Sequence, residues 1–218
     1  MIYAIVAAGT ALATRWLTPE ARPAGQVWPG PGPARARLGT SIGCCSGGIR
    51  HMSVSDLLVD GFGRVQEVVH EVLDGLTADD LTFQVDDQAN SIGWLIWHLT
   101  RVQDDHIAGA AGLDQVWLEG WQQRAGLPFA ETEIGYGQDP AVVPQVRLPT
   151  EFLAGYYDAT HAQTLSFVRG LRDADLAAVV DTRWDPPVTL GVRLVSVISD
   201  DLQHAGQAAY VRGVLLRR

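Results

Sequence analysis

The sequence predicts an all-α protein, built as a four-helix bundle with short extra helices in the connections. Three observations support this prediction. Four long stretches place apolar residues at helical spacing, alternation typical of strands is sparse, and no segment of 20–50 residues is repeated. A long connection separates the second stretch from the third, which is compatible with a bundle. An α/β fold is disfavoured because it requires strand-like runs that the chain lacks.

The first two helices are predicted in the stretches "SDLLVDGFGRVQEVVHEVLDGL", from residue 55, and "NSIGWLIWHLTRVQDDHIAGAAG", from residue 90. The first is amphipathic. The second begins with Asn90 or Ser91 as its N-cap, because both side chains can accept a hydrogen bond from the first turn. Its first two turns are apolar on nearly all sides, so we expect this helix to be buried on several sides.

The remaining helices follow a long connection. A short amphipathic piece, "DQVWLEGWQQRAG", leads into a segment containing Gly and Pro that extends to about residue 149. The third long helix is predicted in "TEFLAGYYDATHAQTLSFVRGL", which starts at Thr150, and the last one from about residue 189 to 215. Pro186 and Pro187 exclude a helix just before the last one.

Residues 1–51 differ in composition from the rest. They are rich in Pro, Gly, Ala and Arg without periodicity, which is typical of disorder. The two methionines of the chain are Met1 and Met52, and the periodic pattern begins just after Met52. We therefore expect a disordered or mis-annotated N-terminal extension over 1–51 and a bundle domain over 52–218. The alternative is an export or anchoring segment that uses the apolar stretch "IYAIVAAGTALA".

The charge and the cysteines exclude several classes of function. The formal net charge is −9, and residues 52–218 combine 11 Arg with 24 acidic residues, which gives −13. An acidic domain without a basic stripe argues against nucleic acid or an anionic membrane as a partner. The two cysteines are the adjacent Cys44 and Cys45, so residues 52–218 contain no thiol. No apolar run reaches the roughly 18 residues of a spanning helix, and we expect a cytoplasmic protein.

The last predicted helix carries two acids and an imidazole on a face that is otherwise apolar. His204 lies four residues from Asp200 and three from Asp201, so these side chains are neighbours on the helix. A buried carboxylate needs a partner. His98, in the apolar part of the second helix, is a candidate. Two imidazoles and one carboxylate can hold a divalent metal and leave positions open. Hydrogen-bonded core histidines are the alternative reading.

At these residues the sequence resembles a known family. The stretches "NSIGWLIWHLTRVQDDH" and "SDDLQHAGQAAYVRG" resemble the DinB-like (YfiT-related) superfamily, and the nearest branch is that of the actinobacterial mycothiol S-transferases. The resemblance covers residues 52–218 and implies an up-down-down-up bundle. It also implies a metal held by one histidine of the second helix and an H-x-x-x-H pair of the last. Here these positions are His98, Asp200 and His204, with Asp200 in place of a histidine. Either Asp200 or Asp201 can be the ligand.

The resemblance implies an enzyme that transfers a low-molecular-weight thiol, mycothiol, to an electrophile. A free thiol has a pKa of about 8.5, and coordination to a divalent metal converts it to the thiolate. Zinc is the expected metal, with nickel or another divalent ion as alternatives. Asp201 or Asp105 is a candidate acceptor of the thiol proton. The expected walls for an apolar electrophile are Trp94, Trp97, Trp121 and Tyr210. Of these, Trp94, Trp97 and Tyr210 are the predicted cofactor-binding residues.

Two other functions fit the same resemblance. One is a non-catalytic binding or stress-response protein, and the other is a mycothiol-dependent isomerase that uses the same site. The resemblance also makes a homodimer a reasonable expectation. Apart from a second copy of the chain, the predicted partners are the small-molecule thiol and the electrophile.

Overall fold

The first two long helices begin at serine caps. The computed structural model describes residues 52–218. Helix α1, Val54–Leu73, starts at Ser53, whose hydroxyl accepts the N–H of Asp56 while the Asp56 carboxylate accepts the N–H of Ser53. Helix α2, Ile92–Ala111, starts at Ser91, whose hydroxyl accepts the N–H of Trp94. Of the two predicted caps, Ser91 and not Asn90 therefore caps α2. The predictions for residues 1–51 lie outside the described residues.

The last two long helices also follow the prediction. Helix α4, Thr150–Val168, ends three residues before the predicted stretch does, in a tight turn. Helix α5, Leu190–Leu215, starts at Thr189, whose hydroxyl accepts the N–H of Val192. The predicted all-α bundle is confirmed. Among the described residues, no helix combines the length and the apolar character of a membrane span.

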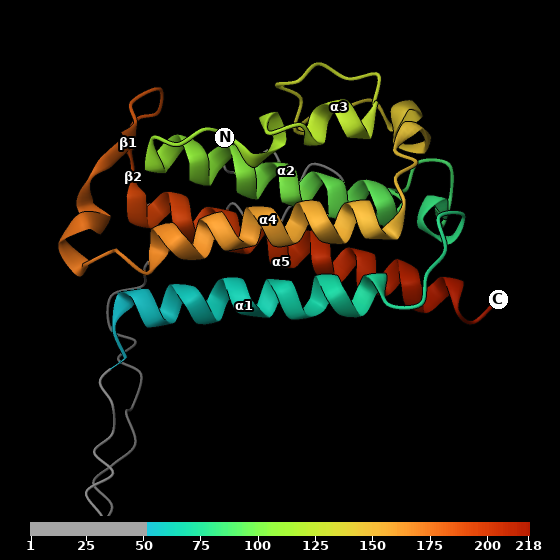
Figure 1. Ribbon diagram of the computed structural model, residues 1–218, viewed down its shortest axis with the longest axis horizontal. Coiled ribbons are helices and arrows are strands. Elements are labelled where there is room, and N and C mark those ends of the chain that lie inside the picture. The colour runs from blue at the N-terminus through green and yellow to red at the C-terminus, as the bar shows by residue number, and fades with distance from the viewer. Residues whose placement is uncertain (1–51) are drawn as a thin grey trace, which may run out of the picture. The chain divides into compact units, whose positions relative to one another are not determined.

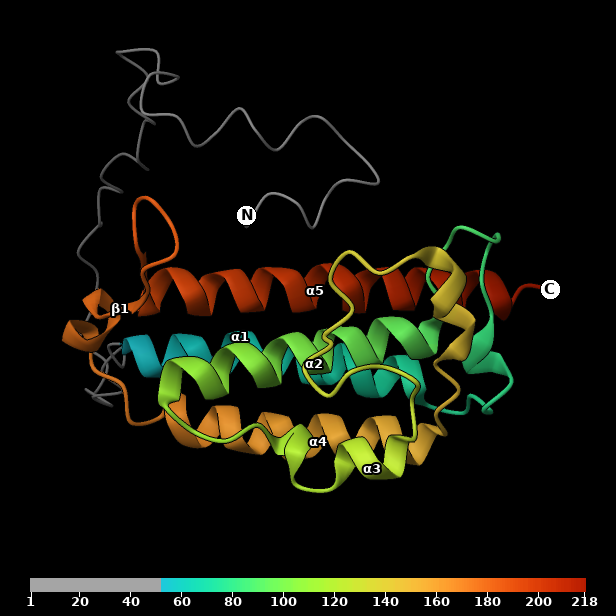
Figure 2. The same cartoon turned by 90° about the horizontal axis from the view of Figure 1, so that it is seen from above.

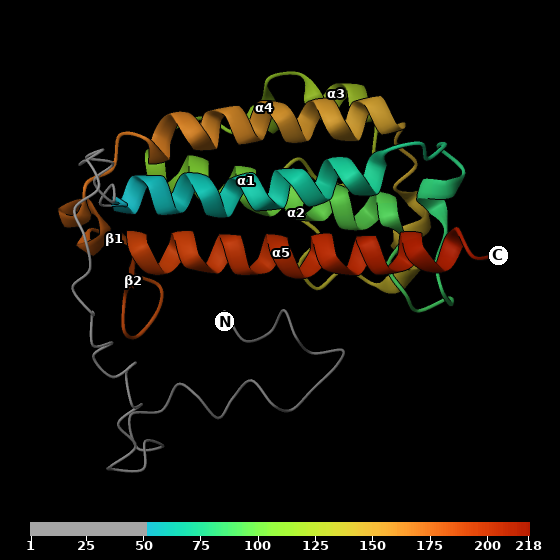
Figure 3. The same ribbon diagram turned by 90° about the horizontal axis from the view of Figure 1, so that it is seen from below.

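The four helices form an up-down-down-up bundle. Helices α1 and α5 run in one direction, and α2 and α4 run in the other (Figure 1). Both α1 and α2 pack against α4 and α5. Seen from below, α1 lies between α4 and α5 (Figure 3). The neighbours α2 and α5 are antiparallel, so the early turns of α2 lie beside the later turns of α5.

Short elements fill the connections. Between α1 and α2 lies the 3₁₀ turn η4, Asp80–Thr82. The long connection from α2 to α4 holds η5, Val116–Leu118, α3, Trp121–Ala125, and η6, Pro140–Gln145. This connection passes over α2 (Figure 2). The predicted short helices in the connections are therefore present.

A small hairpin precedes α5. After η7, Asp173–Ala177, strand β1, Val179–Asp181, pairs with β2, Val188–Thr189, in antiparallel fashion. Pro186 and Pro187 lie in the loop between the strands, in agreement with the exclusion of a helix there. Strands of three and two residues are too short to produce a readable alternation, which explains why the sequence did not indicate them.

The first three turns of α2 are buried on all sides, and burial of the first two was predicted. Every residue from Ile92 to Asp104 is buried, and Trp97 and Leu99 are fully inaccessible. His98 lies in this segment and is itself only 3% exposed. An imidazole in such surroundings needs a specific partner for its nitrogen atoms.

Candidate metal centre

Three predicted ligands come together where α2 and α5 meet. His98, Asp200 and His204 each offer one ligand atom, and these atoms all lie within 4.8 Å of one another. The two imidazole rings are 4.7 Å apart between centroids and meet edge to face. Nε2 of His204 is 3.7 Å from Oδ1 of Asp200, one helical turn away. The antiparallel packing of α2 on α5 therefore creates a group of two nitrogen donors and one carboxylate.

The potential metal-ligand atoms on α5 lack hydrogen-bond partners within the described part of the chain. Both carboxylate oxygens of Asp200 and Nε2 of His204 are buried without one. Buried polar atoms are rarely left unpaired, and leaving them so costs about 1–3 kcal/mol each. Two imidazoles and a carboxylate are a donor set that zinc and other divalent transition metals prefer. The three residues thus fit a divalent metal ion.

Each imidazole is oriented by a hydrogen bond at its other nitrogen. Nδ1 of His98 donates to the carbonyl oxygen of Ile134, and Nδ1 of His204 donates to Oε1 of Gln207, 3.0 Å away. A carbonyl oxygen can only accept, so Nδ1 of His98 carries the proton. The lone pair of Nε2 is then left for a metal in both rings. Such outer hydrogen bonds are typical of metal-ligating histidines.

Burial controls the protonation of the site. It lowers the pKa of His98 to about 3, with a further contribution from the neighbouring His204. His98 is therefore neutral at pH 7, the form that binds a metal. Burial raises the pKa of the Asp200 carboxyl, and His204 opposes this effect. Burial disfavours the ionised Asp200 carboxylate because it removes hydrating water. A cation bound beside it would favour the ionised form by direct attraction.

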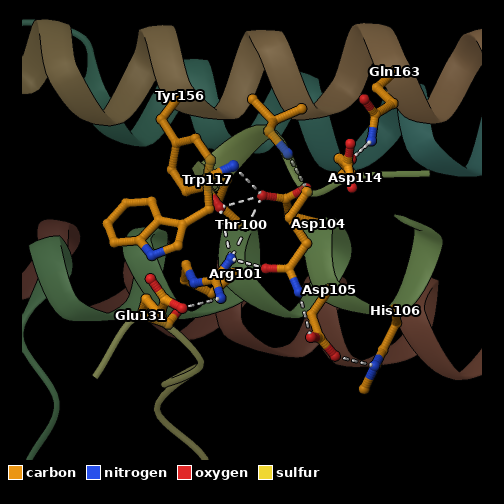
Figure 4. A network of polar contacts seen from close by, with 12 residues as sticks. Thr100, Arg101, Asp104, Asp105, His106, Asp114, Trp117, Glu131, Tyr156 and Gln163 are labelled. Atoms are coloured by element: carbon orange, nitrogen blue, oxygen red, sulfur yellow. Dashed lines mark hydrogen bonds and ion pairs between the residues drawn. The ribbon is translucent and has the colours of Figure 1, made fainter. Parts of the chain in front are cut away.

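A buried polar network lies one turn further along α2 (Figure 4). Asp104 accepts hydrogen bonds from the backbone N–H of Val116 and Trp117, at 2.9 and 2.8 Å, and from the hydroxyl of Tyr156, at 2.7 Å. The Arg101 guanidinium is 3.5 Å from Asp104, and neither side chain is exposed. This network ties the start of the long connection to α2 and α4.

Comparisons with known proteins agree with this architecture. The family model described as the DinB superfamily matches residues 62–208. The chain belongs to the DinB superfamily. A solved structure described as a conserved protein from Enterococcus faecalis is 29% identical and superposes with a TM-score of 0.72. The match covers 77% of this chain and all of the other. No curated protein matches the sequence.

Only one of the two adjacent acids of α5 belongs to the candidate metal centre of this DinB bundle. Asp200 belongs to the group of three, whereas Asp201 does not. Asp201 is fully inaccessible, and neither of its carboxylate oxygens has a hydrogen-bond partner among the described residues. Burial raises its pKa well above the ordinary range, and repulsion from Asp200 adds to this effect. The assignment of Asp201 as the acceptor of a proton stays a prediction.

Of the predicted aromatic walls of this DinB site, Trp94 and Trp97 are neighbours, with ring centroids 6.3 Å apart, whereas Tyr210 lines a different surface. Trp94 stacks on His98, with ring centroids 4.7 Å apart, and Trp97 is fully buried against Phe129. Tyr210 is 66% exposed and lines a separate hollow of about 540 Å³. Trp94 therefore stacks on a ligand of the metal centre, Trp97 lies next to Trp94, and Tyr210 lies at a neighbouring surface. The assignment of these residues to a cofactor site stays a prediction.

Two other predicted candidates have structural partners elsewhere. Trp121 packs against Phe152 and Tyr156 of α4. Asp105 accepts a hydrogen bond from Gln115 and lies 3.0 Å from His106. Neither belongs to the group of three ligands.

Gly135 is a site residue that the sequence did not indicate. It has φ +89°, and a Cβ at this position would lie 2.6 Å from Nδ1 of His98 and 3.0 Å from Trp94. Only glycine allows the backbone to come so close to the imidazole. The triplet "GYG" contains this residue, but such a triplet in a loop carries no recognisable motif. The requirement arises from a contact between α2 and a distant loop.

Proposed function

We propose that this DinB protein is a metal-dependent thiol S-transferase that uses mycothiol. The observation that carries the proposal is the group of His98, Asp200 and His204, in which the ligand atoms of Asp200 and His204 are buried without hydrogen-bond partners. Three protein ligands leave coordination positions open, as in catalytic rather than structural sites. A bound divalent metal lowers the pKa of a coordinated thiol and supplies the thiolate nucleophile. Residues 52–218 contain no cysteine, so the thiol has to come from a small molecule.

The hollow beside the metal centre is evidence for an uncharged co-substrate. It has a volume of about 540 Å³. Its lining contains no acidic or basic side chain and comprises Val85, Ala89, Asn90, Leu95, Gln203, Gly206, Gln207, Tyr210 and Val211. Gln207 connects the hollow to the centre because its Oε1 accepts the hydrogen bond of His204. Amide side chains suit the hydroxyl and amide groups of a neutral thiol such as mycothiol.

The reaction exchanges one bond at an electrophilic carbon. The thiol sulfur loses its proton and forms a C–S bond, while the leaving group departs with the electrons of its own bond. Asp201 is the proposed acceptor of the thiol proton. Burial, with a smaller contribution from the adjacent Asp200, raises the pKa of Asp201. A cation held at Asp200 would oppose this rise because an opposite charge favours the ionised carboxylate.

The test is conjugation of mycothiol with monobromobimane, followed by fluorescence, on protein loaded with zinc. We expect conjugation faster than the uncatalysed reaction of the thiol with the bimane, and only when both the metal and the protein are present. The His204→Ala variant should lose it, whereas the exposed Val195→Ala on the same helix should retain it. Equal rates with and without the metal would contradict the proposal. Stoichiometric metal without conjugation would instead favour the non-catalytic alternative.

A further inference from the structure

One short segment of the long connection lies against His98. Residues 131–135, which we call the 131–135 strap, supply the Ile134 carbonyl that accepts the hydrogen bond of His98. The direction of this carbonyl decides which nitrogen of His98 carries the proton. It therefore also decides which nitrogen is free for a metal.

The Arg101 side chain holds the strap by hydrogen bonds to two of its backbone carbonyl oxygens. Nε of Arg101 donates to the carbonyl of Glu133 at 3.2 Å, and Nη2 donates to the carbonyl of Glu131 at 3.3 Å. Figure 4 shows Arg101 between Glu131 and Asp104. Arg101 is itself fixed because its Nη1 donates to the hydroxyl of Tyr156 at 3.2 Å. The start of the strap thus has a rigid support on α2.

The end of the strap is held by the Glu133 side chain. Its Oε1 accepts the backbone N–H of Ile134 at 3.0 Å and that of Gly135 at 2.8 Å. The N–H of Gly135 and the carbonyl of Ile134 belong to the same planar peptide group. In a trans peptide these two groups point in opposite directions. An acceptor that fixes the N–H of Gly135 therefore also fixes the direction of the carbonyl that faces His98.

We propose that Glu133 is a positioning residue of the metal centre. Through the Ile134–Gly135 peptide it keeps the proton of His98 on Nδ1 and presents Nε2 toward Asp200 and His204. The proposal rests on the metal site of the proposed function, but not on thiol transfer. It assigns a role to a side chain outside the group of three ligands.

The geometry indicates that Glu133 acts as a hydrogen-bond acceptor and that this role does not require its negative charge. Both backbone N–H groups donate to the same oxygen, Oε1, and the amide oxygen of glutamine can accept the same two bonds. Glu133→Gln should therefore behave like the wild type, and Glu133→Ala should not. Glu131→Ala is the matched control. It removes the same charge from the same strap, while the backbone carbonyl that Arg101 holds stays in place.

The experiment has two readouts on the full-length chain. The first is the ¹⁵N NMR signal of the His98 ring in metal-free protein, which distinguishes a protonated Nδ1 from a protonated Nε2. The second is the dissociation constant for Zn²⁺, with the absorption spectrum of the Co²⁺-loaded protein as a report of geometry. For Glu133→Ala we expect a mixture of tautomers, affinity weaker by about 10- to 100-fold, and an altered Co²⁺ spectrum. Glu133→Gln and Glu131→Ala should match the wild type.

The outcomes separate this inference from the proposed function. A wild-type tautomer and affinity in Glu133→Ala would overturn the inference, whether or not the protein transfers thiols. Loss in Glu133→Gln equal to that in Glu133→Ala would overturn the acceptor role. If the wild type bound no Zn²⁺, the role of Glu133 at a metal centre would be overturned, and the NMR readout would then decide only whether Glu133 fixes the tautomer of His98. Circular dichroism of each variant establishes that the bundle is folded when these values are compared.

Discussion

At the scale of single residues, the donor set of the metal centre depends on Asp200. Asp200→Asn keeps the size of the side chain but removes the anionic oxygen, and we expect the Zn²⁺ dissociation constant to rise by about 10-fold or more. Asp200→His restores an imidazole donor of the kind that the family resemblance implies, and should retain binding. Both values are measured by competition with a chromophoric chelator.

A second acid of the same chain provides the control for this prediction. Asp105→Asn changes a partly buried carboxylate on α2 whose partners are Gln115 and His106. It should bind Zn²⁺ like the wild type. Weakening by Asp105→Asn as large as that by Asp200→Asn would show that net charge, rather than coordination, determines the affinity.

Gly135 is the second residue on which we expect metal binding to depend, because a single added Cβ atom would collide with His98. Gly135→Ala should weaken Zn²⁺ binding by about 10-fold or more, because its Cβ would displace the His98 ring or the strap. Gly137→Ala is the matched control, since Gly137 also has a positive φ, +70°, but nothing lies within 4 Å of its Cβ position. It should cost only the backbone strain, about 1 kcal/mol of unfolding free energy. Similar metal affinities in the two variants would contradict this role of Gly135.

At the scale of elements, the stability of the long connection depends on Asp104. Asp104→Ala leaves the buried Arg101 guanidinium without its ionic partner and frees two backbone N–H groups of η5. We expect a loss of about 3–5 kcal/mol in the unfolding free energy, measured by urea denaturation. Asp60→Ala, which breaks the exposed pair with Arg64, should produce no measurable change. Equal effects would contradict the assignment of Asp104 as the anchor of this connection.

The helices were predictable because their signals are local. Ser91 and the apolar turns that follow it lie within a few residues of one another, and the same is true of Asp200 and His204. The 131–135 strap was not predictable in this way. Its bonds join Arg101 to Glu133 and His98 to Ile134 across the long connection, and such pairs exist only once the chain has folded. The pairing of His98 with the last helix was proposed from the apolar surroundings of His98 and from the family resemblance, and the fold brings these residues together.

At the scale of the whole molecule, the up-down-down-up order explains where the polar interior lies. Because α2 and α5 are antiparallel neighbours, a buried histidine early in α2 meets buried acids near the middle of α5. The adjacent Asp201 and the hydroxyl of Tyr157 are also buried without hydrogen-bond partners in the described part of the chain. Burying these groups opposes folding, so the metal-free bundle should be less stable than its apolar core alone would make it.

This cost makes the stability of the metal-free protein depend on pH. The pKa of His98 is about 3 in the folded state and about 6.5 in the unfolded chain. Below pH 6.5 the unfolded chain binds a proton that the folded protein does not, so acid favours unfolding. The contribution of His98 should fall by about 1.4 kcal/mol for each pH unit between 6.5 and 3. The raised pKa values of Asp200 and Asp201 act in the opposite direction, because the folded state binds their protons first.

A comparison with His98→Asn isolates the histidine, because the variant keeps the two acids. Urea denaturation in the presence of a chelator, at steps between pH 7 and pH 4, gives the unfolding free energy of both proteins. The unfolding free energy of the wild type relative to His98→Asn should decrease as the pH falls below 6.5. Its slope should approach about 1.4 kcal/mol per pH unit, the value for one proton. A difference that stayed constant over this range would mean that His98 is protonated equally in the folded and unfolded states. That result would contradict a neutral imidazole with Nε2 available to a metal.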